Sequence, residues 1–200
     1  MKYIGMIGRL NGDRITYNQE IIEAIYRYHC IPLGIIVNFA KDSQTEWNLI
    51  RPLLDLCSGF ILQGGSEYYE IDTLIIKYLY EKNIPTLGIC LGMQTMAMCF
   101  NGEMGTIGNS HKSNEKYVHT VDIVKSSKLF EIIQKDKIMV NSRHQDYIIK
   151  TDLQVSATAN IIEAVEDKTK DFFIGVQWHP ESLQDENNEK IFKNFFFTIK

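Results

Sequence analysis

The chain has 200 residues, 44% of them hydrophobic, which is enough for one domain with a sizeable buried core. Its formal net charge of −4 argues against nucleic acid as the main partner, because nucleic-acid binding needs a cationic surface. No secretory signal or bilayer-spanning apolar stretch is present, and the cysteines form no C-x-x-C pair. The sequence therefore predicts a cytoplasmic protein with reduced thiols and no membrane association.

The first hundred residues alternate between short apolar runs and amphipathic helical patterns. Strands are expected at 3–7, 31–37, 59–62 and 84–89, and helices at 16–28, 49–56, 72–80 and directly after residue 90. Near-continuous apolar strands that alternate with helices are typical of a parallel sheet covered on both faces. We expect an α/β fold with three layers and a central, mostly parallel sheet, whose functional site lies at the carboxyl ends of the strands.

The second half of the chain has a different residue pattern, with more polar segments between the apolar ones. Residues 103–114 are polar and glycine-rich and are expected to form a loop, as is the short segment 9–15. Strands are expected at 117–124, 137–140 and 153–159, a hairpin at 160–166 and 172–176, and helices at 128–133 and 188–199. Because no repeat or linker interrupts the chain, residues 1–200 are expected to form a single catalytic domain.

One stretch carries most of the chemical signal. Within residues 84–99 a buried strand turns into a helix at Cys90, with Gly88 and Gly92 two residues to either side. This is the spacing of the G-x-S-x-G nucleophile elbow, with cysteine in place of serine. Glycines let the strand and helix pack closely around a strained turn, and the helix N-terminus offers free N–H groups to an anion. The alternative is a buried structural cysteine.

A second motif could supply the base that a thiolate nucleophile needs. A predicted strand delivers His179-Pro180-Glu181, and in extended backbone residues i and i+2 point to the same side. Glu181 could then orient the imidazole of His179 toward Cys90. Two alternatives remain open: that His144 is the base, or that Cys90, His179, Glu181 and His144 hold zinc, for which no ligand spacing gives support. We expect no metal and no cofactor.

Together these motifs resemble the class I glutamine amidotransferases, and the resemblance runs nearly end to end. It rests on the segments Gly88-Ile89-Cys90-Leu91-Gly92-Met93-Gln94 and Gln177-Trp178-His179-Pro180-Glu181. Within that superfamily, Val140-Asn141-Ser142-x-His144-Gln145 resembles the γ-glutamyl-γ-aminobutyrate hydrolases. The resemblance implies a flavodoxin-like fold and a set of site residues. These are the catalytic Cys90, His179 and Glu181, the backbone oxyanion donors Gly65 and Leu91, and the substrate-binding Gln94, Ser142 and His144.

The sequence then predicts hydrolysis of a small γ-glutamyl amide through a γ-glutamyl thioester, with release of glutamate and an amine. A first alternative is a glutaminase subunit that delivers ammonia to a separate synthetase partner, since no phosphate-binding G-x-x-x-x-G-K-[ST] motif is present. A second is a ligand-binding module without catalysis. Only six residues, 66–71, separate Gly65 from the next predicted helix, where the hydrolases that the chain resembles usually carry a longer insertion. This leaves the amine undefined.

Overall fold

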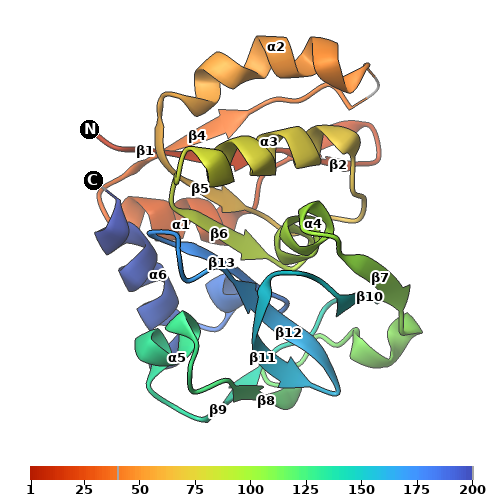
Figure 1. Ribbon diagram of the computed structural model, residues 1–200, viewed down its shortest axis with the longest axis vertical. Helices are drawn as coiled ribbons and strands as arrows, with labels where there is room; N and C mark the ends of the chain where they lie inside the picture. Colours follow the sequence, from red (N-terminus) through yellow and green to blue (C-terminus); the bar gives the residue numbers. More distant parts are fainter. Residues whose placement is uncertain (40, 200) are drawn as a thin grey trace.

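A computed structural model describes residues 1–39 and 41–199 (Figure 1). The strands are β1 (Tyr3–Ile7), β2 (Arg9–Asn11), β3 (Arg14–Thr16), β4 (Ile31–Ile35), β5 (Cys57–Leu62), β6 (Thr86–Ile89), β7 (Glu103–Thr106), β8 (His119–Ile123), β9 (Lys137–Val140), β10 (Asp146–Lys150), β11 (Gln154–Ala159), β12 (Ile161–Glu166) and β13 (Phe173–Val176). The helices are α1 (Gln19–Arg27), α2 (Ser43–Leu54), α3 (Glu70–Glu81), α4 (Leu91–Cys99), α5 (Lys128–Ile133) and α6 (Glu186–Thr198), with short 3₁₀ helices η1 (Gly108–His111) and η2 (Pro180–Ser182).

The central sheet has the strand order β4-β1-β5-β6-β13-β12-β11-β8-β9. Strands β4, β1, β5, β6 and β13 pair in parallel, whereas β12, β11, β8 and β9 continue the sheet in antiparallel register. The predicted hairpin is confirmed, because Ala164 of β12 lies opposite Val176 of β13. The sheet is therefore parallel in the half that the first hundred residues build, and mixed beyond it.

Helices cover both faces of the parallel half, which gives the three expected layers (Figure 1). On one face, α1, α5 and α6 bury an apolar cluster that includes Ile25 and Phe192. On the other face, α2, α3 and α4 bury a second cluster that includes Ile75 and Met93. Along β5 the side chains alternate between the two, with Ile61 in the first cluster and Leu62 in the second. Burial on both faces is the reason these strands read as near-continuous apolar runs.

Two segments expected to be loops contain regular structure. Residues 103–114 include β7 and η1, and residues 9–15 belong to the β2–β3 hairpin. The strand β10 was not anticipated; it pairs with β7 and β12. These strands are short and partly exposed, so they lack the apolar run or the alternation that predicts a strand from sequence. Their order comes from pairing between segments about 40 residues apart, such as Thr106 with Asp146.

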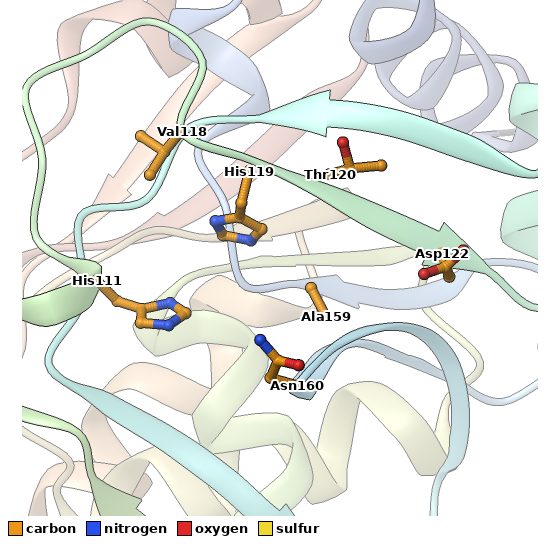
Figure 2. A pocket seen from close by; sticks show the side chains of 7 residues that line it. All are labelled: His111, Val118, His119, Thr120, Asp122, Ala159 and Asn160. Atoms are coloured by element: carbon orange, nitrogen blue, oxygen red, sulfur yellow. The ribbon is translucent and has the colours of Figure 1, made fainter.

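A cavity of about 330 Å³ lies on the mixed half of the sheet, beside η1 (Figure 2). It is lined by His111, Val118, His119, Thr120, Asp122, Ala159 and Asn160. Among the helices that the structure describes, none has the length and apolar character needed to cross a bilayer.

Candidate active site

The carboxyl ends of three neighbouring parallel strands form the candidate site. Gly64 and Gly65 follow β5, Cys90 follows β6 and His179 follows β13 by three residues. Since β6 pairs with β5 on one side and β13 on the other, these residues meet at one edge of the sheet. These residues therefore lie where the sequence predicts the site, at the carboxyl ends of the parallel strands.

Cys90 occupies a strained turn between β6 and α4. Its φ of 52° and ψ of −107° lie outside the regions that side chains ordinarily adopt. Glycines on both sides make the turn sterically feasible: a Cβ at Gly92 would lie 2.0 Å from the carbonyl oxygen of Leu62, and one at Gly88 would lie 2.4 Å from Met96 Sδ. The backbone N–H of Cys90 donates to Val176 of β13 (2.8 Å), which fixes the turn to the neighbouring strand. Such strain is typical of a functional position.

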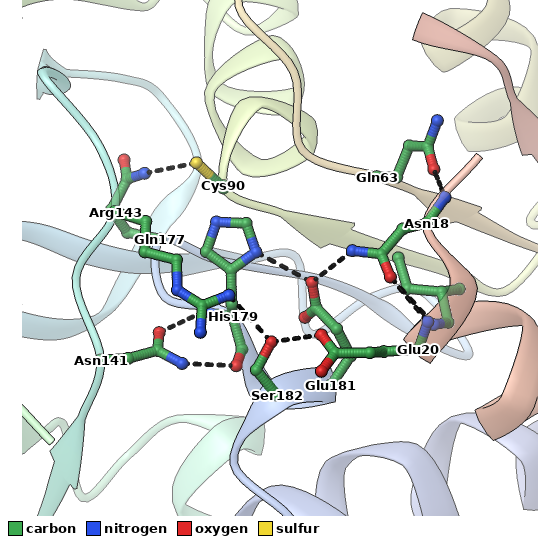
Figure 3. A network of polar contacts seen from close by, with 11 residues as sticks. Asn18, Glu20, Gln63, Cys90, Asn141, Arg143, Gln177, His179, Glu181 and Ser182 are labelled. Atoms are coloured by element: carbon green, nitrogen blue, oxygen red, sulfur yellow. Dashed lines mark hydrogen bonds and ion pairs between the residues drawn. The ribbon is translucent and has the colours of Figure 1, made fainter. Parts of the chain in front are cut away.

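The imidazole of His179 lies between Cys90 and the buried carboxylate of Glu181 (Figure 3). His179 Nδ1 donates to Glu181 Oε1 at 2.8 Å, and the same oxygen accepts from Asn18 Nδ2 at 3.1 Å. On its other side the imidazole faces Cys90, which raises the pKa of His179. Glu181 lies in the 3₁₀ helix η2 and not in the extended backbone that the sequence predicts. The expected contact between His179 and Glu181 forms nevertheless.

Backbone contacts hold the histidine in place. The Asn141 side chain accepts from the backbone N–H of His179 (2.8 Å) and donates to its carbonyl oxygen (2.9 Å). Asn18 serves two elements at once, because its side-chain oxygen caps α1 while its amide nitrogen reaches Glu181. Sequence reasoning missed the role of Asn18, and no local signal marks a helix cap that contacts a residue 163 positions away.

The electrostatics favour a protonated His179. Burial alone would lower its pKa, but hydrogen bonds with Cys90 and Glu181, and the negative charges of both partners, outweigh burial and raise the pKa to about 10. By contrast, burial lowers the pKa of His144 to about 4, so that imidazole is neutral near pH 7. The structure therefore gives no support to His144 as the base, because the histidine that faces Cys90 is His179.

Gly65 and Leu91 are brought together beside Cys90. A Cβ at Gly65 would lie 2.9 Å from Leu91 Cδ2 and 3.1 Å from Arg9 Cγ, so a larger residue there would require these side chains to shift. Arg9 is itself held by a buried ion pair with Asp72 at 2.8 Å. Leu91 is the first residue of α4, where a helix has no backbone partner for its N–H groups.

A cavity of about 200 Å³ opens above Cys90 and contains most of the predicted binding residues. Its wall includes Gly65, Ser66, Tyr68, Cys90, Leu91, Gln94, Met104, Lys112, Arg143, His144, Gln145 and Asp146. Two of these side chains, Lys112 and Arg143, are cationic, which suits a ligand with a carboxylate.

Gln94 and Ser142 differ in their relation to this cavity. Gln94 lines it, and its amide nitrogen donates to the carbonyl oxygen of Asp146 (2.9 Å) and to Gln177 Oε1 (3.1 Å). Ser142 is fully buried and donates to the backbone carbonyl of His111 at 2.5 Å. Ser142 thus lies behind the lining residues and fastens η1, and direct contact with a substrate there remains a prediction.

The potential metal-ligand cluster in the structure differs from the zinc site considered from the sequence, which consisted of Cys90, His179, Glu181 and His144. Among the described residues, potential metal-ligand atoms converge at His111, His144 and Glu163. The ring centroid of His111 lies 5.4 Å from that of His119 and 5.2 Å from that of His144.

Comparison with known proteins decides the family. The family model for class-I glutamine amidotransferases matches residues 13–199. The chain belongs to this family. This amidotransferase is 36% identical over 146 residues to the glutamine-hydrolyzing GMP synthase of Francisella philomiragia subsp. philomiragia, covering 70% of the chain and 27% of that protein. It is 33% identical over 173 residues to the GMP synthase of Francisella tularensis subsp. holarctica, covering 84% of the chain and 30% of that protein.

Solved structures show the same fold. A glutamine amidotransferase from Methylobacillus flagellatus superposes with a TM-score of 0.72 at 14% identity, over 100% of this chain and 96% of that one. The glutaminase domain of Trypanosoma brucei CTPS with bound acivicin superposes with a TM-score of 0.68 at 17% identity, over 100% of this chain and 95% of that one. The predicted α/β fold with a mostly parallel sheet and the predicted superfamily are confirmed.

The predicted branch within the superfamily, that of the γ-glutamyl-γ-aminobutyrate hydrolases, is not confirmed. These curated relatives are GMP synthases and not γ-glutamyl-γ-aminobutyrate hydrolases, and this amidotransferase spans less than a third of their length. Membership of the family supports cleavage of an amide C–N bond, whereas the substrate and the roles of individual residues stay predictions.

Proposed function

We propose that this chain is the glutaminase component of an amidotransferase. Cys90 would cleave the side-chain amide of glutamine, and the ammonia released would be used by a synthetase module outside these 200 residues. The observation that carries the proposal is the contact series from Cys90 through His179 to Glu181 at the strand ends. The glutamine-hydrolyzing GMP synthases among the relatives favour glutamine over other γ-glutamyl amides.

In the first half-reaction, the proton of the Cys90 thiol already lies on His179, and the sulfur attacks the amide carbon as a thiolate. A C–S bond forms while the carbonyl electron pair moves onto oxygen. The raised pKa of His179 keeps the proton on the imidazole until the tetrahedral adduct collapses. The C–N bond then breaks, His179 gives its proton to the leaving nitrogen, and ammonia departs from a γ-glutamyl thioester.

The developing oxyanion needs donors that are already in place. The backbone N–H groups of Gly65 and Leu91 are the proposed donors, because both residues line the cavity around Cys90 and lie close to each other. The residue after the nucleophile is where this elbow geometry supplies such a donor. Removing one donor of this kind typically lowers the rate by a factor of roughly 10²–10³.

In the second half-reaction water replaces the amine. His179 takes a proton from water, and the resulting hydroxide attacks the thioester carbon. The C–S bond breaks, the sulfur departs as a thiolate while the proton taken from water stays on His179, and glutamate leaves. Glu181 holds Nδ1 of the imidazole throughout, so that Nε2 faces the reacting atoms.

A second candidate is a free-standing hydrolase of γ-glutamyl amines. It is favoured by the segment Val140–Gln145, which resembles the γ-glutamyl-γ-aminobutyrate hydrolases and contributes His144 to the cavity wall. A module that only binds ligand is disfavoured, since the strained backbone of Cys90 and the buried Glu181 would then serve no purpose.

Substrate comparison separates these candidates. Purified chain is incubated with glutamine and with a series of γ-glutamyl amines, and glutamate release is measured alongside Cys90→Ala. Higher kcat/KM for glutamine, increased by a GMP-synthase-type ATP-dependent module and abolished by Cys90→Ala, is the expected result. A kcat/KM for a γ-glutamyl amine at least about tenfold above that for glutamine would establish the second candidate, since tenfold corresponds to about 1.4 kcal/mol in the barrier.

A further inference from the structure

Three polar side chains from separate elements converge beside the cavity of Figure 2. His111 ends η1, His144 follows β9, and Glu163 lies in β12. One potential ligand atom of each residue lies within 4.8 Å of the other two. Each residue also has a buried atom for which the described structure offers no hydrogen-bond partner: His111 Nδ1, His144 Nε2 and Glu163 Oε2.

Burial makes these unpaired atoms informative. Glu163 is fully buried, and His144 is 5% exposed. A buried polar atom without a partner destabilises the fold, so native structures rarely retain several in one place. Unpaired atoms on three residues whose potential ligand atoms converge point to a ligand that all three residues share.

We propose that His111, His144 and Glu163 bind a divalent transition-metal ion of the zinc type. Two imidazole nitrogens and one carboxylate oxygen form a ligand set that zinc accepts, and a water can complete a tetrahedron. Imidazole nitrogens favour such ions over magnesium or calcium, which prefer oxygen ligands.

The surrounding hydrogen bonds fit this assignment. His144 Nδ1 donates to the carbonyl oxygen of Asp146 at 3.0 Å, which leaves the lone pair of Nε2 free for the ion. The other carboxylate oxygen of Glu163 accepts from His119 Nε2 at 2.9 Å. Metal-bound histidines and carboxylates usually have outer partners of these two kinds, which orient them and fix the histidine tautomer.

The site has an access route from solvent. The rings of His111 and His119 point into the hollow in Figure 2, and Thr120 and Asp122 at its edge are exposed. An ion entering through this cavity meets the half-buried His111 first and the buried Glu163 beyond it.

The ion would brace the wall of the cavity above Cys90. His144 belongs to both places, because it lines that cavity and offers Nε2 to the ion. The backbone carbonyl of Glu163 accepts from Gln177 N–H at 2.7 Å, in the segment that leads to His179. The proposed role is therefore structural, and it does not depend on which amide the enzyme cleaves.

Metal analysis of the untagged 200-residue chain tests this. Protein purified without chelators is expected to contain close to one zinc per chain. After chelation, added Co²⁺ is expected to give the intense visible bands of tetrahedral coordination, and added Zn²⁺ is expected to raise the melting temperature. Glu163→Gln and the half-buried His111→Asn should each weaken metal binding by at least about tenfold, since even outer-shell changes cost roughly 10–100-fold.

Two control variants locate the ion. His29→Asn alters an exposed histidine elsewhere, and Cys90→Ser removes the candidate nucleophile; both should keep full metal content. Circular dichroism establishes that each variant is folded, and His111→Asn remains as the test should Glu163→Gln not fold. Less than about a tenth of an equivalent of bound zinc or cobalt would overturn the proposal and leave buried water as the shared partner. Loss of metal in Cys90→Ser, or its retention in both ligand variants, would overturn it equally.

Discussion

At the scale of single residues, the site depends on one imidazole held between two negative partners. His179 Nδ1 is hydrogen-bonded to the Glu181 carboxylate, and the other side of the ring faces Cys90. The Asn141 side chain is hydrogen-bonded to both the backbone N–H and the backbone carbonyl of His179. Local patterning predicted that Cys90, His179 and Glu181 lie close together, and the structure brings them together, whereas their catalytic roles stay predictions. The contacts of Asn18 and Asn141 with this group arise from distant segments and could not be read from spacing.

The raised pKa of His179 makes its contribution to stability depend on pH. Its pKa is about 10 in the folded chain against 6.5 as the ordinary value, so between these values the folded state binds the proton that the unfolded state has lost. The stabilisation is fully present below about pH 6.5 and is lost as the pH rises through about 10. Urea unfolding of wild type and His179→Gln should show a stability difference that shrinks over that range. A difference that grows with pH would contradict the assigned charge state.

Gly64 sets the position of the His179 ring. A Cβ at Gly64 would lie 3.0 Å from His179 Cε1 and 3.7 Å from the Cβ of Cys90, so Gly64→Ala should displace the imidazole by a few tenths of an ångström. We expect kcat for amide hydrolysis to fall roughly tenfold, with little change in stability, because small misplacements of a catalytic group are costly. Steady-state kinetics and urea unfolding measure both effects. Gly12→Asn, at a turn with open space around it, is the matched control and should leave kcat unchanged.

At the scale of elements, the parallel half of the sheet was predictable and the mixed half only in part. Strands β5 and β6 are buried on both faces and read as apolar runs, and α2 forms as expected although Pro52 lies within it. By contrast, β7 and β10 are recognisable only as partners of each other. The residues His111, His144 and Glu163 likewise converge from separate segments that share no motif spacing. The sequence therefore could not predict this cluster, and the expectation of no metal did not consider it.

The junction of β6 and α4 depends on close contact with β5. A Cβ at Gly92 would lie 2.0 Å from the carbonyl oxygen of Leu62, which is backbone and cannot move aside cheaply. Gly92→Ala is therefore expected to destabilise the fold by about 3 kcal/mol, the upper part of the usual overpacking range. The free energy of unfolding in urea provides the measurement. A loss below about 1 kcal/mol would show that the elbow is less tightly packed than the structure has it.

At the scale of the whole molecule, three layers serve to bring the ends of β5, β6 and β13 to one edge. Helices on both faces bury the strands, and the polar groups around the cavity above Cys90 come from the loops at that edge together with α4 and β10. The chain covers 27–30% of the length of its GMP synthase relatives, and the proposed function assigns the use of ammonia to a module beyond these residues. Which module that is does not alter the chemistry expected at Cys90.

The most direct test of the central claim is to trap the acyl-enzyme. Purified chain is mixed with glutamine, quenched in acid after a short interval, digested and analysed by mass spectrometry. We expect a γ-glutamyl group attached to the peptide that contains Cys90, and none in Cys90→Ala. Glutamate release without any adduct on Cys90, or an adduct on Cys30, Cys57 or Cys99 instead, would contradict it.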